Sequence, residues 1–243
     1  PLSPELLAKP PAGAVKNLIF DLPSYYLLAN ALKDNILANI RYYESRNNPY
    51  IVNYGTKKGR PGIETFPQLQ NMTLAQVSRF AQGTGTFEGT DFRRLNTVTN
   101  KYQTPFAMGL YQMIPDTIKE IIQKNGNYNP EVANLLFTPE NQHVFGTMLL
   151  FNKRPTIGSF LIGKHNKEIQ AGQSLAREWA YAPLQYPEAG QQRGQSRYGG
   201  DGVNKHGTTP ETIVRDLKAG RDAIELIKDQ LVLYSGVPYN LAG

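Results

Sequence analysis

The chain has no cysteine among its 243 residues and only three histidines. Without cysteine it can form no disulfide, no thiolate metal site and no cysteine nucleophile, so its stability must come from packing alone. The histidines, His143, His165 and His206, are widely spaced and have no accompanying acidic pair. The local sequence therefore assembles neither a zinc-protease helix nor a serine triad, and we expect no metal and no cofactor.

Long apolar runs and phosphate-binding loops are also lacking. No apolar run approaches the ~18 residues that a membrane-spanning helix needs, so we expect no stable insertion into a membrane. Gly83-Thr84-Gly85 has neither a strand pattern before it nor a helix pattern after it. Because a phosphate loop needs both, nucleotide chemistry is disfavoured.

The charge is positive but not concentrated. The 26 Lys and Arg against 20 Asp and Glu give a net charge of +6, with a pI near 9.3. This balance suits an anionic partner, whether nucleic acid, a membrane surface or an anionic bacterial wall, and it also fits an ordinary basic protein. Dense basic runs are few, among them Lys57-Lys58-Gly59-Arg60 and the pair Arg93-Arg94. We therefore expect no nucleic-acid partner.

The N-terminal half contains one strong helix pattern. Prolines in the first 23 residues predict an irregular arm. Ser24 can cap a helix over 25–46, in which Leu28, Leu32, Ile36 and Ile40 recur at helical spacing. Asn47-Asn48-Pro49 should end this helix, because a residue that precedes proline is pushed away from helical angles. Glu44 then lies in the last turn.

The rest of the chain predicts a mainly α protein with a small β-ribbon, an α+β class. The ribbon should lie within 50–70, and a flexible loop should cover 83–102. We expect the remaining helices at 73–81, 115–122, 130–136, 139–153, 167–181 and 210–234, with a structured surface loop over 183–207. The predicted organisation is an arm (1–23), one domain (24–207) and a C-terminal helix that packs on or extends it (208–243).

Glu44 is the acidic residue whose setting favours chemistry. It follows Tyr42-Tyr43 at the end of an apolar helix, so partial desolvation and the negative end of the helix dipole should both raise its pKa. A carboxyl group that stays protonated near neutral pH can donate a proton to a leaving sugar oxygen. The alternative is a solvated glutamate paired with Arg41 or Arg46.

Four segments carry a resemblance to a known family. They are Glu44-Ser45, residues 50–55 (YIVNYG), residues 107–115 (AMGLYQMIP), and the pair of 175–180 (LAREWA) with 198–204 (YGGDGVN). In this order they resemble the lysozyme-fold wall hydrolases of bacteriophages, namely the lambda-type endolysins and related phage tail transglycosylases. The insert over 83–101 is longer than that family pattern needs.

The resemblance implies a lysozyme-like fold and an enzyme that cuts bacterial peptidoglycan between N-acetylmuramic acid and N-acetylglucosamine. It makes Glu44 the catalytic acid and base, and without a second acid the muramic acid's own 6-hydroxyl would close a 1,6-anhydro product, which is lytic transglycosylation. The residues expected to bind substrate or orient the acid are Ser45, Tyr50, Asn53, Tyr54, Tyr111, Gln112 and Tyr198. Asp201 is expected to shape one end of the groove with Tyr198, whereas Trp179 is expected in the core.

The sequence leaves other functions open. A second acid, with Glu64, Glu88 and Asp91 as candidates, would make the enzyme a hydrolytic muramidase. Three other functions are also open: a non-catalytic wall-binding or structural module, a nucleic-acid-binding helical domain, and a chitinase-like enzyme. The resemblance implies that the protein acts in the periplasm or the extracellular wall space. Before its release it could lie in the host cytoplasm or form part of a virion. A phage particle, a secretion system or an immunity protein is the implied class of protein partner.

Overall fold

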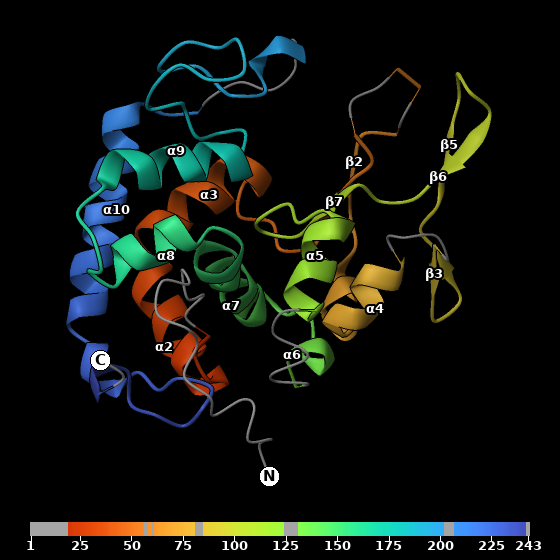
Figure 1. Cartoon of the computed structure of the whole chain (residues 1–243). Coiled ribbons are helices and arrows are strands. Elements are labelled where there is room, and N and C mark those ends of the chain that lie inside the picture. The colour runs from red at the N-terminus through yellow and green to blue at the C-terminus, as the bar shows by residue number, and fades with distance from the viewer. Residues whose placement is uncertain are drawn as a thin grey trace.

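The computed structural model describes residues 19–55, 58–59, 61–80, 85–123, 131–201 and 207–241. It confirms the α+β class, with most of the helices grouped in one part and the short antiparallel strands lying with the remaining helices in the other (Figure 1). The helices are α2 (Leu22–Leu32), α3 (Ile36–Ser45), α4 (Leu74–Arg79), α5 (Pro115–Ile121), α6 (Glu131–Asn134), α7 (Pro139–Met148), α8 (Pro155–Leu161), α9 (Glu168–Glu178) and α10 (Pro210–Glu225). Most of the predicted N-terminal arm lies outside the described residues.

The predicted single helix over 25–46 is wrong, because the chain forms α2 and α3 with a break at Asn35. The Asn35 backbone is non-helical, at φ −127° and ψ −103°. Its side chain accepts from Ile36 N at 2.7 Å and donates to Ala31 O at 2.8 Å. One asparagine thus stabilises both helix ends. Ser24 is not the cap of α2 either, since Asp21 accepts from Ser24 N at 2.9 Å.

The predicted ribbon is confirmed and gains a third strand. Strand β1 (Ile51–Asn53) pairs antiparallel with β2 (Ile63–Thr65) and, on its other side, with β7 (Ala107–Met108). The sheet begins six residues after the end of α3 in sequence, so it continues directly from the helix that carries Glu44.

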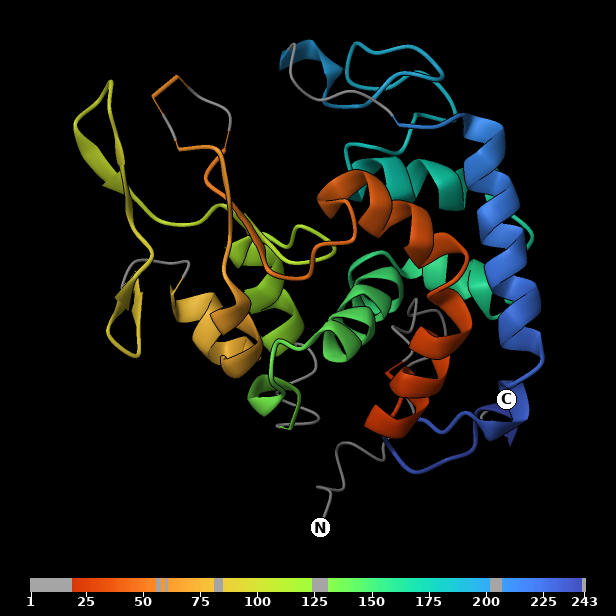
Figure 2. The same cartoon turned by 180° about the vertical axis from the view of Figure 1, so that it is seen from behind.

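The predicted flexible loop over 83–102 is instead folded into two hairpins where it is described. Strands β3 (Thr86–Phe87) and β4 (Thr90–Asp91) form one, and β5 (Arg94–Asn96) and β6 (Lys101–Gln103) form the other. Phe92, between them, is buried and packs edge-on against Phe66 and Phe80. This aromatic contact anchors the hairpins to the domain, and no local pattern of apolar residues predicts it. They project on the side away from α9 and α10 (Figures 1 and 2).

The helical part is built around α7. A π-helical turn, η4 (Leu149–Lys153), continues α7, and α8, which the sequence patterns did not predict, follows it. α10 packs against α2, α3, α8 and α9, with its apolar residues Ile213, Leu217 and Ile224 fully buried. Within the described ranges no helix is both long and apolar enough to cross a membrane.

The predicted helix over 210–234 is too long, because α10 ends at Glu225. Beyond a 3-10 turn (Lys228–Gln230) the chain pairs with the segment before α2. Asp21 N donates to Val232 O at 2.9 Å, and Tyr234 N donates to Ile19 O at 3.0 Å. These non-local backbone bonds replace helical ones in the last part of the described chain.

Candidate functional site

Glu44 lies in the last turn of α3, as predicted, with a partly buried side chain. Desolvation by the surrounding protein raises the pKa of this carboxyl from 4.5 to about 7. The backbone N–H of Tyr181 donates to the carboxylate and lowers the pKa, but less than burial raises it. Glu44 can therefore exist in both protonation states near neutral pH, as a group that first donates and then accepts a proton must.

The alternative ion pair with Arg41 or Arg46 is not formed. The Arg41 guanidinium donates to Lys33 O, and the Arg46 guanidinium lies 5.0 Å from the centre of the Tyr42 ring. Among the residues that the structure describes, Glu44 takes part in no ion pair within 4 Å. Because none of the described cations pairs with this carboxylate, the effect of burial on its pKa is not offset by an ion pair.

Two stacked tyrosines form the wall beside Glu44. The rings of Tyr43 and Tyr181 lie 5.4 Å apart and are nearly parallel, with an angle of 9° between them. Gly207 closes on them: its N–H donates to Tyr181 O at 2.8 Å, and a Cβ there would stand 2.3 Å from Cδ1 of Tyr43. Sequence reasoning missed Tyr181 and Gly207, since both are more than 130 residues away from Glu44 along the chain.

Gln142 on α7 fixes the link between Glu44 and the sheet. Its side chain is 1% exposed. Its Nε2 donates to Pro49 O at 2.9 Å and to Phe137 O at 3.0 Å, and its Oε1 accepts from Leu110 N at 2.8 Å. One buried amide thus joins the α3–β1 connection to the turn that follows β7. Sequence reasoning also missed this residue.

Three of the predicted contact residues lie in the scaffold. Ser45 is 1% exposed and donates to Arg41 O at 2.8 Å. The Tyr54 hydroxyl donates to Phe92 O at 2.6 Å, and the Tyr111 hydroxyl bonds His143 Nδ1 at 2.5 Å. These groups are buried and already hydrogen-bonded within the fold, where they stabilise the local structure. Trp179 packs in the core as predicted, 4% exposed, and donates to Tyr111 O at 3.0 Å.

The other predicted contact residues are partly exposed. Tyr50 donates to Gln70 Oε1 at 3.2 Å, and the Asn53 side chain accepts from Gly55 N at 2.7 Å. Gln112 has a positive φ of 46° and donates to Gly109 O at 3.1 Å within the turn after β7. All three lie on the sheet or close to its strands, and their side chains are partly exposed.

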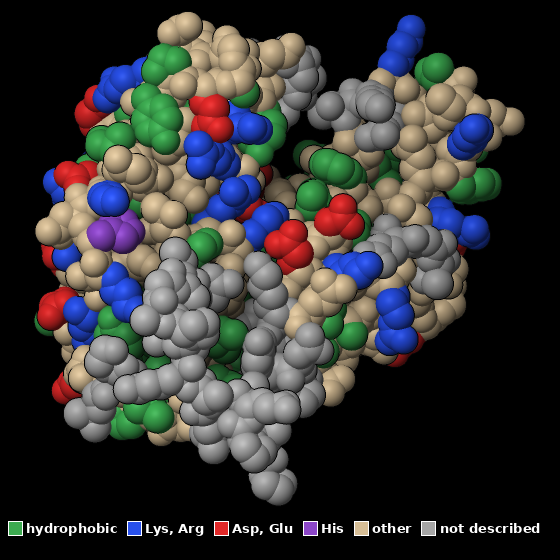
Figure 3. Space-filling model, in the orientation of Figure 1, with side chains coloured by type: hydrophobic (Ala, Val, Ile, Leu, Met, Phe, Trp, Pro, Cys, Tyr) green, Lys and Arg blue, Asp and Glu red, His purple; other side chains and the backbone are tan. Residues whose placement is uncertain are grey.

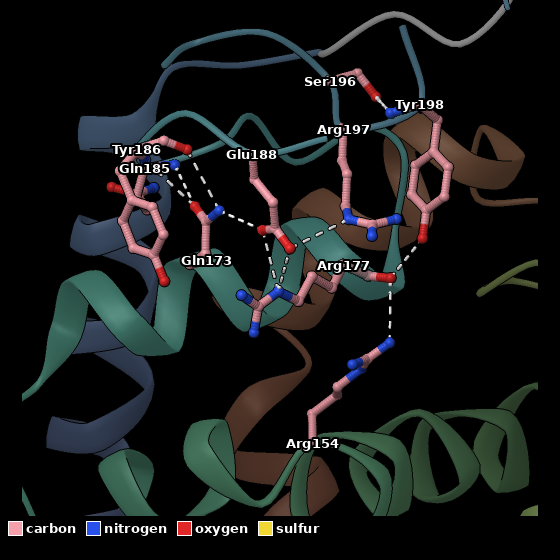
Figure 4. A network of polar contacts seen from close by, with 9 residues as sticks. All are labelled: Arg154, Gln173, Arg177, Gln185, Tyr186, Glu188, Ser196, Arg197 and Tyr198. Carbon is pink, nitrogen blue, oxygen red and sulfur yellow. Dashed lines mark hydrogen bonds and ion pairs between the residues drawn. The ribbon is translucent and has the colours of Figure 1, made fainter. Parts of the chain in front are cut away.

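Tyr198 belongs to a polar network that holds the segment 183–201 on α9 (Figure 4). Its hydroxyl donates to Arg177 O at 2.5 Å. Glu188 pairs with Arg177 at 3.0 Å and with Arg197 at 3.5 Å, and it accepts from Gln173 Nε2 at 2.6 Å. The predicted surface loop is thus structured over its described part, and two arginines share one carboxylate there. The side chain of Asp201 lies outside what the structure describes.

None of the three candidate second acids is a free carboxylate placed beside Glu44. Glu64 on β2 pairs with Arg94 at 2.9 Å. Asp91 pairs with Arg93 at 2.9 Å, and the hydrogen bonds from Arg93 lower the pKa of Asp91 to about 2. Glu88 lies exposed in the β3–β4 turn. Within the described part of the chain, the causes of the Glu44 pKa shift are burial and the Tyr181 backbone, and no acidic side chain is among them.

The molecule is hollowed between the helical part and the hairpin part, and Lys and Arg side chains gather on the helical side of this hollow (Figure 3). Within the described ranges, no group of three or more His, Cys, Asp and Glu is placed to hold a metal ion. In comparisons with known proteins, no protein-family model, no curated protein and no solved structure matches the chain significantly.

Proposed function

We propose that the chain cleaves the β-1,4 bond between N-acetylmuramic acid and N-acetylglucosamine in bacterial peptidoglycan, with Glu44 as its acid and base and with a lysozyme-like fold. The observation that carries the proposal is the state of Glu44: a partly buried carboxyl with no ion pair among the described residues and a pKa of about 7. A small antiparallel sheet follows its helix, as the lysozyme-like reading expects. Such an enzyme would act in the periplasm or the extracellular wall space, where its substrate lies.

The reaction needs one group in two protonation states. Protonated Glu44 donates to the glycosidic oxygen, the C1–O bond of the muramic acid breaks, and an oxocarbenium-like centre forms at C1. The Glu44 carboxylate then takes the proton of the muramic acid's 6-hydroxyl as that oxygen bonds to C1. A 1,6-anhydro ring closes, no water is consumed, and Glu44 returns to its protonated state.

Among the residues that the structure describes, no acidic side chain is a cause of the pKa shift of Glu44, and this favours transglycosylation over hydrolysis. An inverting glycosidase needs a second carboxylate that activates water, and a retaining one needs a carboxylate nucleophile. Glu64 and Asp91 are neutralised by arginines, and Glu88 is exposed in a hairpin turn. The Tyr43–Tyr181 wall contributes the partial burial that a general acid of this pKa requires.

The test is digestion of purified peptidoglycan by the wild-type protein and by Glu44→Gln, followed by mass spectrometry of the released fragments. We expect fragments that are about one water lighter than hydrolysis products, since the 6-hydroxyl replaces water. Glu44→Gln should release none. Glu131→Gln, which changes an exposed glutamate at the start of α6, is the matched control and should retain full activity.

Each other outcome has a definite meaning. Ordinary reducing ends would show a hydrolytic muramidase, and Glu64→Gln, Glu88→Gln and Asp91→Asn would then identify the second acid. Release of the same fragments by Glu44→Gln would overturn the role of Glu44. If the wild-type protein released no fragments, the proposal that the chain is an enzyme would be overturned.

A further inference from the structure

A concave site lies on the hairpin side of the molecule. The pocket has a volume of about 390 Å³ and is lined by the end of β6 and the segment that leads to β7 (102–106), together with Tyr54 and Pro115. This volume falls in the range of small-molecule sites, roughly 300–1,000 Å³. Phe106 N donates to Asn53 O at 2.8 Å, so the pocket adjoins the end of β1, in the sheet that follows the Glu44 helix.

The pocket contains the side-chain amide of Gln103, which is without a hydrogen-bond partner among the described residues. Oε1 of Gln103 is shielded from solvent and accepts no hydrogen bond, and the side chain of Gln103 is in none of the hydrogen bonds found among the described residues. A buried acceptor without a partner destabilises the fold, because it has lost its hydrogen bonds to water. The terminal torsion of glutamine is soft, so a small rotation turns either end of this amide toward the pocket. A ligand that carries both a donor and an acceptor, as another amide does, would satisfy both ends.

The remainder of the lining is uncharged and aromatic. The side chains of Tyr102 and Phe106 are 67% and 53% exposed, which is unusual for rings of this size. The Arg93 guanidinium lies 5.6 Å from the centre of the Tyr102 ring and braces its orientation. Pro105 and Pro115 add rigid apolar surface. Flat apolar rings beside a single amide fit a ligand that combines an apolar face with one amide group and no charge.

An N-acetylated sugar has this chemistry. We propose that the pocket is a binding subsite for one N-acetylhexosamine of a glycan strand. Its acetamido group pairs with the side-chain amide of Gln103, and its pyranose face stacks on Tyr102 or Phe106. The choice of a glycan rests on the proposed function. The subsite uses the hairpin insert to hold the strand on the hairpin side, whereas Glu44 acts at the end of α3.

The experiment measures binding apart from cleavage. Full-length Glu44→Gln is titrated with tri-N-acetylchitotriose, with the glucosamine trimer and with cellotriose, by calorimetry and by NMR. We expect binding of tri-N-acetylchitotriose and at least tenfold weaker binding of the other two trimers, because neither carries the acetamido group. Adding Gln103→Ala or Tyr102→Ala should each weaken binding of the acetylated trimer at least tenfold.

The controls separate the subsite from folding and from catalysis. Gln192→Ala and Tyr186→Ala change an exposed glutamine and a partly exposed tyrosine away from the pocket and should leave the affinity unchanged. Neither Tyr102→Ala nor Gln103→Ala should lower the melting temperature, since the Tyr102 ring is exposed and the buried Oε1 of Gln103 bonds to none of the described residues. Unchanged affinity in both variants would overturn the subsite, even if wild-type protein digests peptidoglycan. Equal affinity for cellotriose would overturn recognition of the acetamido group. Loss of affinity in both variants would support the subsite even if no peptidoglycan is cleaved.

Discussion

Tyr181 stacks flat on Tyr43 and, through its own backbone N–H, reaches the neighbouring carboxyl of Glu44. The same residue therefore buries the acid and bonds to it, with opposite effects on its pKa. Burial is the larger effect, so the carboxyl stays partly protonated at neutral pH. A wall that shielded Glu44 less, or a backbone that donated more strongly, would leave an ordinary ionised glutamate.

Activity on peptidoglycan should fall as pH rises through about 7, the pKa of Glu44. Above that value the acid loses its proton, and kcat/KM should decrease by about tenfold per pH unit. The measurement is the rate of fragment release between pH 5 and pH 9 at constant ionic strength. A rate that stays level from pH 6 to pH 9 would contradict the assignment of Glu44 as the proton donor.

Glu44→Gln should stabilise the protein at pH 8. The folded pKa of about 7 lies above the unfolded value of 4.5, so the folded state holds this proton more tightly and loses stability as pH rises from 4.5 to 7. Glutamine avoids this loss, and the gain at pH 8 should be up to about 3 kcal/mol. Urea unfolding at pH 8 and pH 4 measures it. The gain should vanish at pH 4, and Glu131→Gln should show no gain at either pH.

Gln142→Leu should destabilise the protein by about 3–5 kcal/mol. The change keeps the approximate volume but leaves Leu110 N, Pro49 O and Phe137 O without this partner in a buried setting. Unfolding in urea gives the difference. Gln192→Leu, on the exposed side of the chain, should stay within about 0.5 kcal/mol of wild type. A small loss for Gln142→Leu would mean that the amide does not join the two segments.

Gly207→Ala should disturb the tyrosine wall, because its Cβ would stand 2.3 Å from Cδ1 of Tyr43. We expect a loss of about 1–3 kcal/mol from overpacking, together with reduced cleavage of peptidoglycan. Gly200→Ala is the matched control, since the nearest atom to its Cβ is 3.5 Å away. Thermal unfolding and the digestion assay on both variants decide the matter, and equal behaviour of the two would refute the close packing of Gly207 on Tyr43.

Tyr181→Phe should cost less than about 1 kcal/mol or stabilise the fold. The Tyr181 hydroxyl is buried and bonds to none of the described residues, so its removal relieves an unsatisfied group and keeps the stacked ring. Tyr25→Phe is the contrast, because the Tyr25 hydroxyl bonds to Asn152 in the core. That variant should lose about 1–2 kcal/mol in chemical denaturation. A larger loss for Tyr181→Phe than for Tyr25→Phe would show a bonded hydroxyl.

Local pattern predicted much of the secondary structure and little of the wall around Glu44. The apolar spacing in α3, the prolines at helix starts and the β-branched run of β1 are visible within a few residues of sequence. The break at Asn35 was hidden because the apolar period continues across it. The hairpins depend on the packing of Phe92, and the wall on Tyr181 and Gly207, which are distant in sequence from the segments that they contact. Contacts between residues so far apart in sequence can be identified only when the fold is known.

The pairing of Phe20 with Leu233 joins the first and last parts of the described chain. Helix ends and chain ends usually fray first, each with its own low opening free energy. Here the segments 19–21 and 232–234 share backbone hydrogen bonds, so neither segment can open without breaking the bonds of the other. The Phe20 ring also packs on Phe151 and Tyr239. Amide hydrogens of Asp21 and Tyr234 should consequently exchange at similar, slow rates, as one cooperative unit with the helical core.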